Sequence, residues 1–157
     1  IVWGFLGITV KIAFVIFAAG APKMLETMGM EITADFMLQE ISLKKVFVAF
    51  VISTTMNLIY APMLMVTHKV TDEHILQNGG TLRGLFRPLR FGHYLINLNW
   101  RVQWEFTFTR VIPFFWIPAQ TVNFLFPSEI RILVAALYGV LLGVFLAIAS
   151  LKSQKKD

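Results

Sequence analysis

The sequence predicts an all-α membrane protein, a bundle of about four transmembrane helices in a single domain covering residues 1–157. Hydrophobic residues make up 57% of the chain and charged residues only 15%, whereas ordinary soluble domains carry about 25% charged residues. A chain this small needs more polar surface to fold in water, so the apolar excess must face lipid. Four stretches approach the roughly 20 apolar residues that a helix needs to cross a hydrocarbon core of about 30 Å. These stretches are residues 1–20, 46–66, 106–126 and 132–151.

The first stretch, residues 1–20, is interrupted by Thr9 and Lys11. A lysine at mid-membrane costs roughly 2.5 to 3.5 kcal/mol on insertion scales, so Lys11 should face a partner or water. One interpretation is that Lys11 lines a water-filled path for anions. The other is that it pairs with a neighbouring helix or extends its ammonium group toward the membrane surface. Because the apolar run starts at once at Ile1, we also expect a further segment upstream.

The second stretch, residues 46–66, is free of charge and is preceded by an acidic connection over residues 21–45. A backbone in lipid must satisfy its amide groups internally, so this run is expected to be a helix. The polar residues that it carries are Ser53, Thr54, Thr55 and Asn57.

A longer, basic connection follows over residues 67–105. Within it, leucine and phenylalanine alternate with arginine in a basic amphipathic pattern that suits an anionic membrane surface. Pro88 must bend or break any helix formed there. The alternative is a solvated loop whose charges stop translocation. The residues of this pattern are Leu82, Arg83, Leu85, Phe86, Arg87, Leu89 and Arg90.

The third stretch, residues 106–126, carries a polar face. Trp116, Gln120 and Asn123 fall at positions i, i+4 and i+7 and therefore share one side of a helix. Pro118 removes a backbone donor and predicts a kink. The polar face either hydrogen-bonds to neighbouring helices as structural glue or lines a cavity. Arg110 lies one turn inside this stretch; it need not pair with Glu105, and we expect it to reach the basic membrane face.

The fourth stretch, residues 132–151, contains no charge and has a small residue at every fourth position. Ala135, Gly139, Gly143 and Ala147 line one face, which lets helix backbones approach closely. We expect this face to pack within the chain, although another copy would serve equally well.

Four spans place residues 67–105 and the C-terminal tail on one side of the membrane. Eight lysines and arginines fall on that side and four on the other, which predicts a C-terminus on the matrix or cytosolic side. The eight are Lys69, Arg83, Arg87, Arg90, Arg101, Lys152, Lys155 and Lys156, and the four are Lys23, Lys44, Lys45 and Arg131.

Several classes of function are disfavoured. The net charge of +5 follows from membrane insertion, so we expect no nucleic-acid partner. The chain has no cysteine, and the group His68, Asp72, Glu73 and His74 matches no strong metal pattern. No phosphate-binding glycine loop or activated nucleophile is present. We therefore expect no enzyme, no cofactor and no metal.

The stretch from Trp116 to Arg131 resembles the C-terminal signature of the Mpv/PMP family of small integral membrane proteins. Those proteins occupy the mitochondrial inner membrane and the peroxisomal membrane. The shared residues are Trp116, Gln120, Asn123-Phe124, Pro127 and Arg131. Pro118 lies one place later than the family's proline, and Pro127 one place earlier. The resemblance covers residues 104–151.

This resemblance implies four membrane helices and a channel-like role in small-solute permeation, linked to mitochondrial homeostasis. On that hypothesis Lys11, Arg110, Gln120 and Asn123 line or gate a cavity, while Trp116 and Pro118 shape the kink. The alternative is a structural accessory subunit of a large membrane complex, such as a respiratory or ATP-synthase assembly. The expected partners are the lipid bilayer and either other membrane subunits or further copies of the chain.

Overall fold

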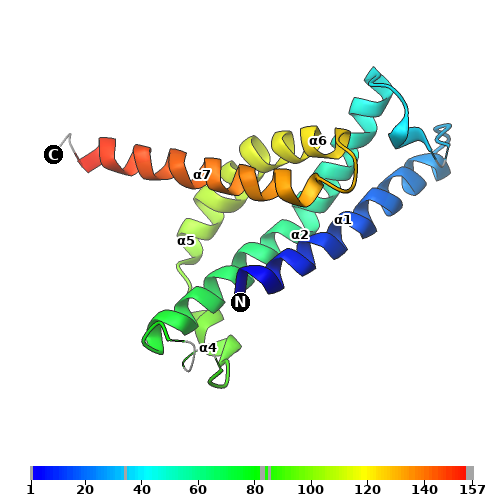
Figure 1. The fold of residues 1–157 in the computed structure, drawn as a ribbon. Helices are drawn as coiled ribbons and strands as arrows, with labels where there is room; N and C mark the ends of the chain where they lie inside the picture. Colours follow the sequence, from blue (N-terminus) through cyan, green and yellow to red (C-terminus); the bar gives the residue numbers. More distant parts are fainter. Residues whose placement is uncertain (1, 34, 82–83, 85, 155–157) are drawn as a thin grey trace.

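A computed structural model describes residues 2–33, 35–81, 84 and 86–154, and these form helices and their connections without a β-strand (Figure 1). The predicted all-α fold is confirmed. Helix α1 lies antiparallel to α2, and the short helix α6 packs against α2 and lies beside the beginning of α7. The elements are α1 (Val2–Thr27), the 3₁₀-helix η1 (Phe36–Leu38), α2 (Leu43–Gln77), α4 (Phe91–Ile96), α5 (Trp100–Val102), the π-helix η2 (Gln103–Trp116), α6 (Ile117–Leu125) and α7 (Arg131–Gln154).

Among the described residues, two helices are long and apolar enough to cross a membrane, rather than the four that the sequence predicts. These are Gly4–Thr27 of α1 and the whole of α2. The third predicted stretch is divided between η2 and α6, so no single α-helix there has the required length. The fourth forms α7, which contains a shorter apolar segment over Arg131–Phe145. Length and composition thus support membrane association through α1 and α2.

Helix α1 continues beyond its predicted end at residue 20 and stops at a glycine. Gly29 has a φ angle of 96°, in the left-handed region that glycine adopts without steric cost. The Gly29 amide donates to the Glu26 carbonyl at 3.0 Å, and the Met30 amide donates to the Leu25 carbonyl at 3.0 Å. These two bonds form a Schellman motif, which satisfies the last carbonyls of the helix.

Helix α2 is 35 residues long and extends well past the predicted end at residue 66. Its N-cap is Ser42, whose Oγ accepts a hydrogen bond from the Lys45 amide at 3.2 Å. Residues 67–77, predicted to belong to a loop, continue the helix. There Gln77 donates to Glu73 one turn earlier at 2.7 Å, an i,i+4 contact that favours helix. The helix ends at Gln77, and Gly79, two residues later, turns the chain with a φ angle of 78°.

The hydrophobic core lies where α6 meets α1 and α2. The Phe124 ring of α6 is fully buried and contacts the Phe14 ring of α1 edge-to-face, with centroids 5.3 Å apart. Tyr60 of α2 donates to the Thr9 hydroxyl of α1 at 2.7 Å. The other buried members of this core are Ala13, Ala21, Leu25, Phe36, Val48, Ala49, Ile52 and Met56.

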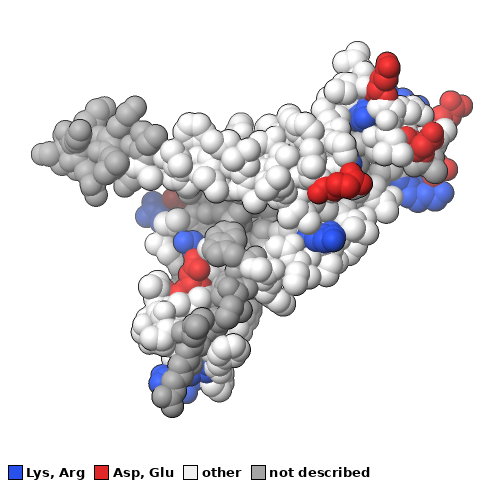
Figure 2. Space-filling model, in the orientation of Figure 1, with Lys and Arg blue, Asp and Glu red and all other residues white. Residues whose placement is uncertain are grey.

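The predicted amphipathic connection does not form a helix where the structure describes its second half. Leu82, Arg83 and Leu85 lie outside the described residues. The segment 86–90 is an exposed, non-helical turn, and α4 begins only at Phe91. Pro88 explains this break, because proline lacks the backbone donor that a helix needs. Charged side chains gather toward the two ends of the α1–α2 pair, and much of the visible surface between them is uncharged (Figure 2).

Candidate functional site

Buried polar residues line the contact between α2 and α6. We call Ser53, Thr54, Asn57, Gln120 and Asn123 the α2–α6 polar interface. The Ser53 hydroxyl donates to the Ile117 carbonyl at 2.7 Å and so joins the two helices directly. Asn57 donates to the Ser53 carbonyl at 2.9 Å within α2. Because Ser53, Asn57, Gln120 and Asn123 are all at most 4% exposed, this interface lies inside the molecule.

The residues of the C-terminal signature meet at the corner between α6 and α7. The Asn123 amide donates to Gln120 Oε1 at 2.8 Å and to the Arg131 carbonyl at 3.1 Å. Arg131 in turn donates through Nε to the Phe126 carbonyl at 2.9 Å. Its guanidinium group also lies over the Phe124 ring, 5.3 Å from the centroid. The carbonyls at the end of α6 thereby gain partners that the helix itself cannot supply.

Three polar atoms on α2, η2 and α6 are buried without a hydrogen-bond partner among the described residues. They are Thr54 Oγ1, Trp116 Nε1 and Asn123 Oδ1. Thr54 and Trp116 each neighbour in sequence one end of the Ser53–Ile117 hydrogen bond. Leaving such an atom unpaired costs about 1–3 kcal/mol, and buried water commonly fills this role. The interface therefore has the polar groups that a few water molecules or a small polar solute would need.

Pro118 lies at the start of α6, where the type of helix changes. Upstream, η2 is a π-helix, and the Ile117 amide bonds to the Ile112 carbonyl five residues earlier. Downstream, α6 is an ordinary α-helix. Figure 1 shows that the chain bends between α5 and α6. The bend lies in the part of the chain where Pro118 predicts a kink, and the structure adds a π-helix before that proline.

Lys11 and Arg110 do not join the α2–α6 polar interface. Both side chains are exposed, on α1 and η2 respectively. Glu105, which need not pair with Arg110, accepts two hydrogen bonds from Arg101 Nε, each of 3.1 Å. The structure therefore brings together Gln120 and Asn123 of the predicted cavity residues, with Trp116 half-buried beside them.

The small-residue face of α7 packs within the chain only at its beginning. Ala135 contacts the core. Gly139 and Gly143 are exposed, and a Cβ atom added to either would meet nothing within 4 Å in the described part of the chain; Ala147 is exposed as well. Among the described residues, the expectation that the whole face packs within the chain is wrong, because α7 runs antiparallel to α6 and extends beyond the start of that short helix (Figure 1).

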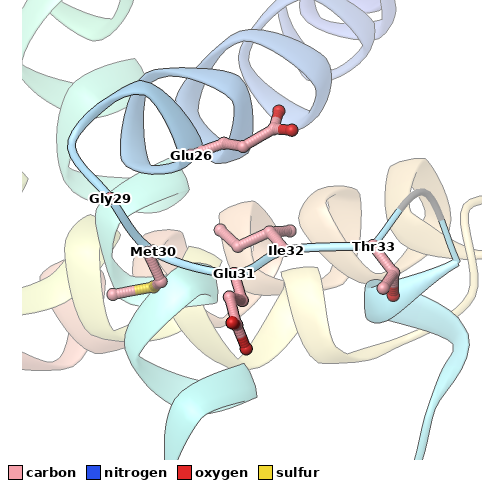
Figure 3. Close-up of a pocket in the computed structure, with 6 residues that line it drawn as sticks. All are labelled: Glu26, Gly29, Met30, Glu31, Ile32 and Thr33. Carbon is pink, nitrogen blue, oxygen red and sulfur yellow. The ribbon is translucent and has the colours of Figure 1, made fainter.

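A pocket of about 500 Å³ lies at the turn after α1. Figure 3 shows that the carboxylates of Glu26 and Glu31 point in different directions, and Glu26 is paired with Lys23 at 2.7 Å. In the part of the chain that the structure describes, no three His, Cys, Asp or Glu side chains converge as metal ligands. The geometry of this pocket therefore gives no cation site.

Sequence reasoning missed a second pocket, of about 480 Å³, at the far end of α2. Lys69, Glu73 and Gln77 of α2 form one wall, and Asn97 and Gln103 lie on the other. The helical spacing of Lys69, Glu73 and Gln77 was a usable signal, but only if residues 67–77 had been recognised as helix.

Comparison of the chain with known protein families, with characterised proteins and with solved structures finds no match.

Proposed function

We propose that the chain is a small integral membrane protein that forms a channel-like path for small polar solutes along the α2–α6 polar interface. The supporting observation is the set of three buried, unpartnered atoms beside that interface: Thr54 Oγ1, Trp116 Nε1 and Asn123 Oδ1. A purely structural contact between helices gains from pairing every buried polar atom. Groups left open inside the molecule instead suit a passing solute or the water that accompanies it.

The setting supports the same proposal. The polar interface lies on α2, which is long and apolar enough to span a bilayer, and polar groups turned inward in such a helix mark solute paths in membrane proteins. Pro118 and η2 lie where the chain bends before α6, the helix on the other side of this interface. By resemblance to the Mpv/PMP family we place the protein in an organelle membrane, the mitochondrial inner membrane before the peroxisomal one. We also propose that the C-terminus lies on the matrix or cytosolic side of the membrane, because the residues on that side carry more lysine and arginine.

The test compares two adjacent threonines in liposomes reconstituted with the full chain. Thr54→Val removes a hydroxyl that has no partner among the described residues. Thr55→Val removes one that donates to the Val51 carbonyl of its own helix at 2.8 Å. We expect Thr54→Val to change the rate of small-solute release, and Thr55→Val to leave it unchanged. Equal release rates for wild type and Thr54→Val, or no release above protein-free liposomes, would refute the proposal.

A second candidate function is that of an accessory subunit in a larger membrane complex. It is favoured by α7, where Gly139 and Gly143 face open space. Small residues allow a helix from another protein to approach closely there. Gly139→Leu would block such an approach without disturbing the described part of this chain. Under this alternative, native electrophoresis in mild detergent shows a large assembly for the wild type, and Gly139→Leu dissociates that assembly. If the wild type and the variant both migrate as a small species, the accessory-subunit alternative is excluded.

A further inference from the structure

The pocket at the far end of α2 carries opposite charges that have no ion-pair partner among the described residues. Lys69 and Glu73 both line it, one helical turn apart. Neither forms an ion pair with a described residue. A lysine placed four residues before a glutamate pairs less favourably than the reverse order, because both charges oppose the helix dipole. The two charges are therefore available to a ligand.

The opposite wall of the pocket contributes the amide of Gln103. This residue is 5% exposed and lines the pocket, and its side chain makes no hydrogen bond with any described residue. Its amide atoms are not fully buried, so they are open to a ligand in the pocket. Gln103 can donate to an anion and accept from a cation.

Each of the remaining polar side chains of the pocket already makes at least one contact, including Asn99, which accepts from the Val102 amide at 3.2 Å. Asp72 lies 3.1 Å from His68 Nδ1. Tyr94 contacts His74 at 3.3 Å, and the Asn97 amide donates to the His93 carbonyl at 2.8 Å. The groups left for a ligand are one ammonium, one carboxylate that also accepts from Gln77, and one carboxamide. This set complements a molecule that carries both charges.

We propose that this pocket binds a zwitterion in which an ammonium group is joined to a phosphate or carboxylate through a short linker. Its anionic group contacts Lys69, its ammonium group contacts Glu73, and Gln103 bonds to either. The site is separate from the α2–α6 polar interface and does not depend on solute permeation.

The position of the pocket allows two sources for this chemistry. Helix α2 continues 11 residues beyond Val66, the end of its apolar run, which is about 16 Å at 1.5 Å per residue. If α2 spans a bilayer, the pocket lies at the level of the lipid headgroups. The zwitterion is then either the headgroup of phosphatidylethanolamine or a water-soluble molecule of the same charge pattern.

The experiment uses the full chain and separates these sources. In one arm, O-phosphoethanolamine is titrated into detergent-purified protein by calorimetry. In the other, native mass spectrometry measures retention of phosphatidylethanolamine relative to phosphatidylglycerol from nanodiscs. Binding in the first arm assigns a soluble ligand, and selective retention in the second assigns a lipid. No binding in either arm overturns the proposal.

Matched variants test the residues. Lys69→Gln and Glu73→Gln are each expected to weaken binding about tenfold or more, because each removes a charge-assisted contact. Lys23→Gln and Glu26→Gln make the same changes at an ion pair on α1 and should leave binding intact. The double variant Lys69→Glu with Glu73→Lys keeps both charges in the pocket and should recover much of the affinity. Unchanged binding in Lys69→Gln and Glu73→Gln, or an equal loss in the α1 variants, overturns the assignment.

Discussion

Replacement of Phe124 by alanine tests whether the junction of α6 with α1 holds the fold together. Phe124 is fully buried. Its ring centroid lies 5.3 Å from that of Phe14 and 5.3 Å from the Arg131 guanidinium. Phe124→Ala removes the ring that these two partners share and leaves a cavity between three helices.

The expected loss is large on the scale of single substitutions. Buried Phe→Ala changes cost about 3–5 kcal/mol of unfolding free energy, and an edge-to-face aromatic pair contributes about 0.5–1.5 kcal/mol beyond its buried area. We expect a value in the upper half of the first range. Phe126→Ala provides the control, because Phe126 is 39% exposed and its backbone carbonyl, which bonds to Arg131, is retained. Its loss should be about 1 kcal/mol.

The assay is reversible unfolding in mixed micelles, in which the mole fraction of denaturing detergent is raised and the fluorescence of the four tryptophans is followed. Circular dichroism of the native variants checks that each starts from a folded state. Equal losses for Phe124→Ala and Phe126→Ala would contradict this prediction, since they would mean that the ring of Phe124 is not buried in the core formed by α1, α2 and α6.

Two further predictions concern single contacts. Ser53→Ala removes the 2.7 Å hydrogen bond to the Ile117 carbonyl and should lower the free energy of unfolding by about 0.5–2 kcal/mol in the same assay. Ser128→Ala, at an exposed corner, should change it very little. Comparable losses for the two variants would count against a hydrogen bond between α2 and α6. Gly29→Ala places a side chain at a φ angle of 96° and should destabilise by about 1–3 kcal/mol. Gly139→Ala, in an open part of α7, should be neutral or stabilise by up to about 1 kcal/mol. A Gly29→Ala variant as stable as wild type would show that α1 does not end in the described motif.

The sequence already indicated which helix faces are polar. The spacing of Gln120 and Asn123 correctly placed two amides on one buried face of α6, because helical periodicity is a local property of the chain. Helical periodicity could not predict which other helix packs against that face. Ser53 and Ile117 are far apart in sequence, and only the packing of α2 against α6 brings them into hydrogen-bond contact.

An all-helical chain with long apolar segments could be predicted from composition and periodicity alone. How far each helix runs and what it contacts became known only from the folded structure. It extended α2 to Gln77 and placed Lys69 and Glu73 opposite Gln103. It also left Gly139 and Gly143 of α7 without a neighbour in the described chain. Most helical stability in proteins comes from packing against other elements. Such contacts join residues that are far apart in the sequence, and a local sequence pattern cannot predict which residues will meet.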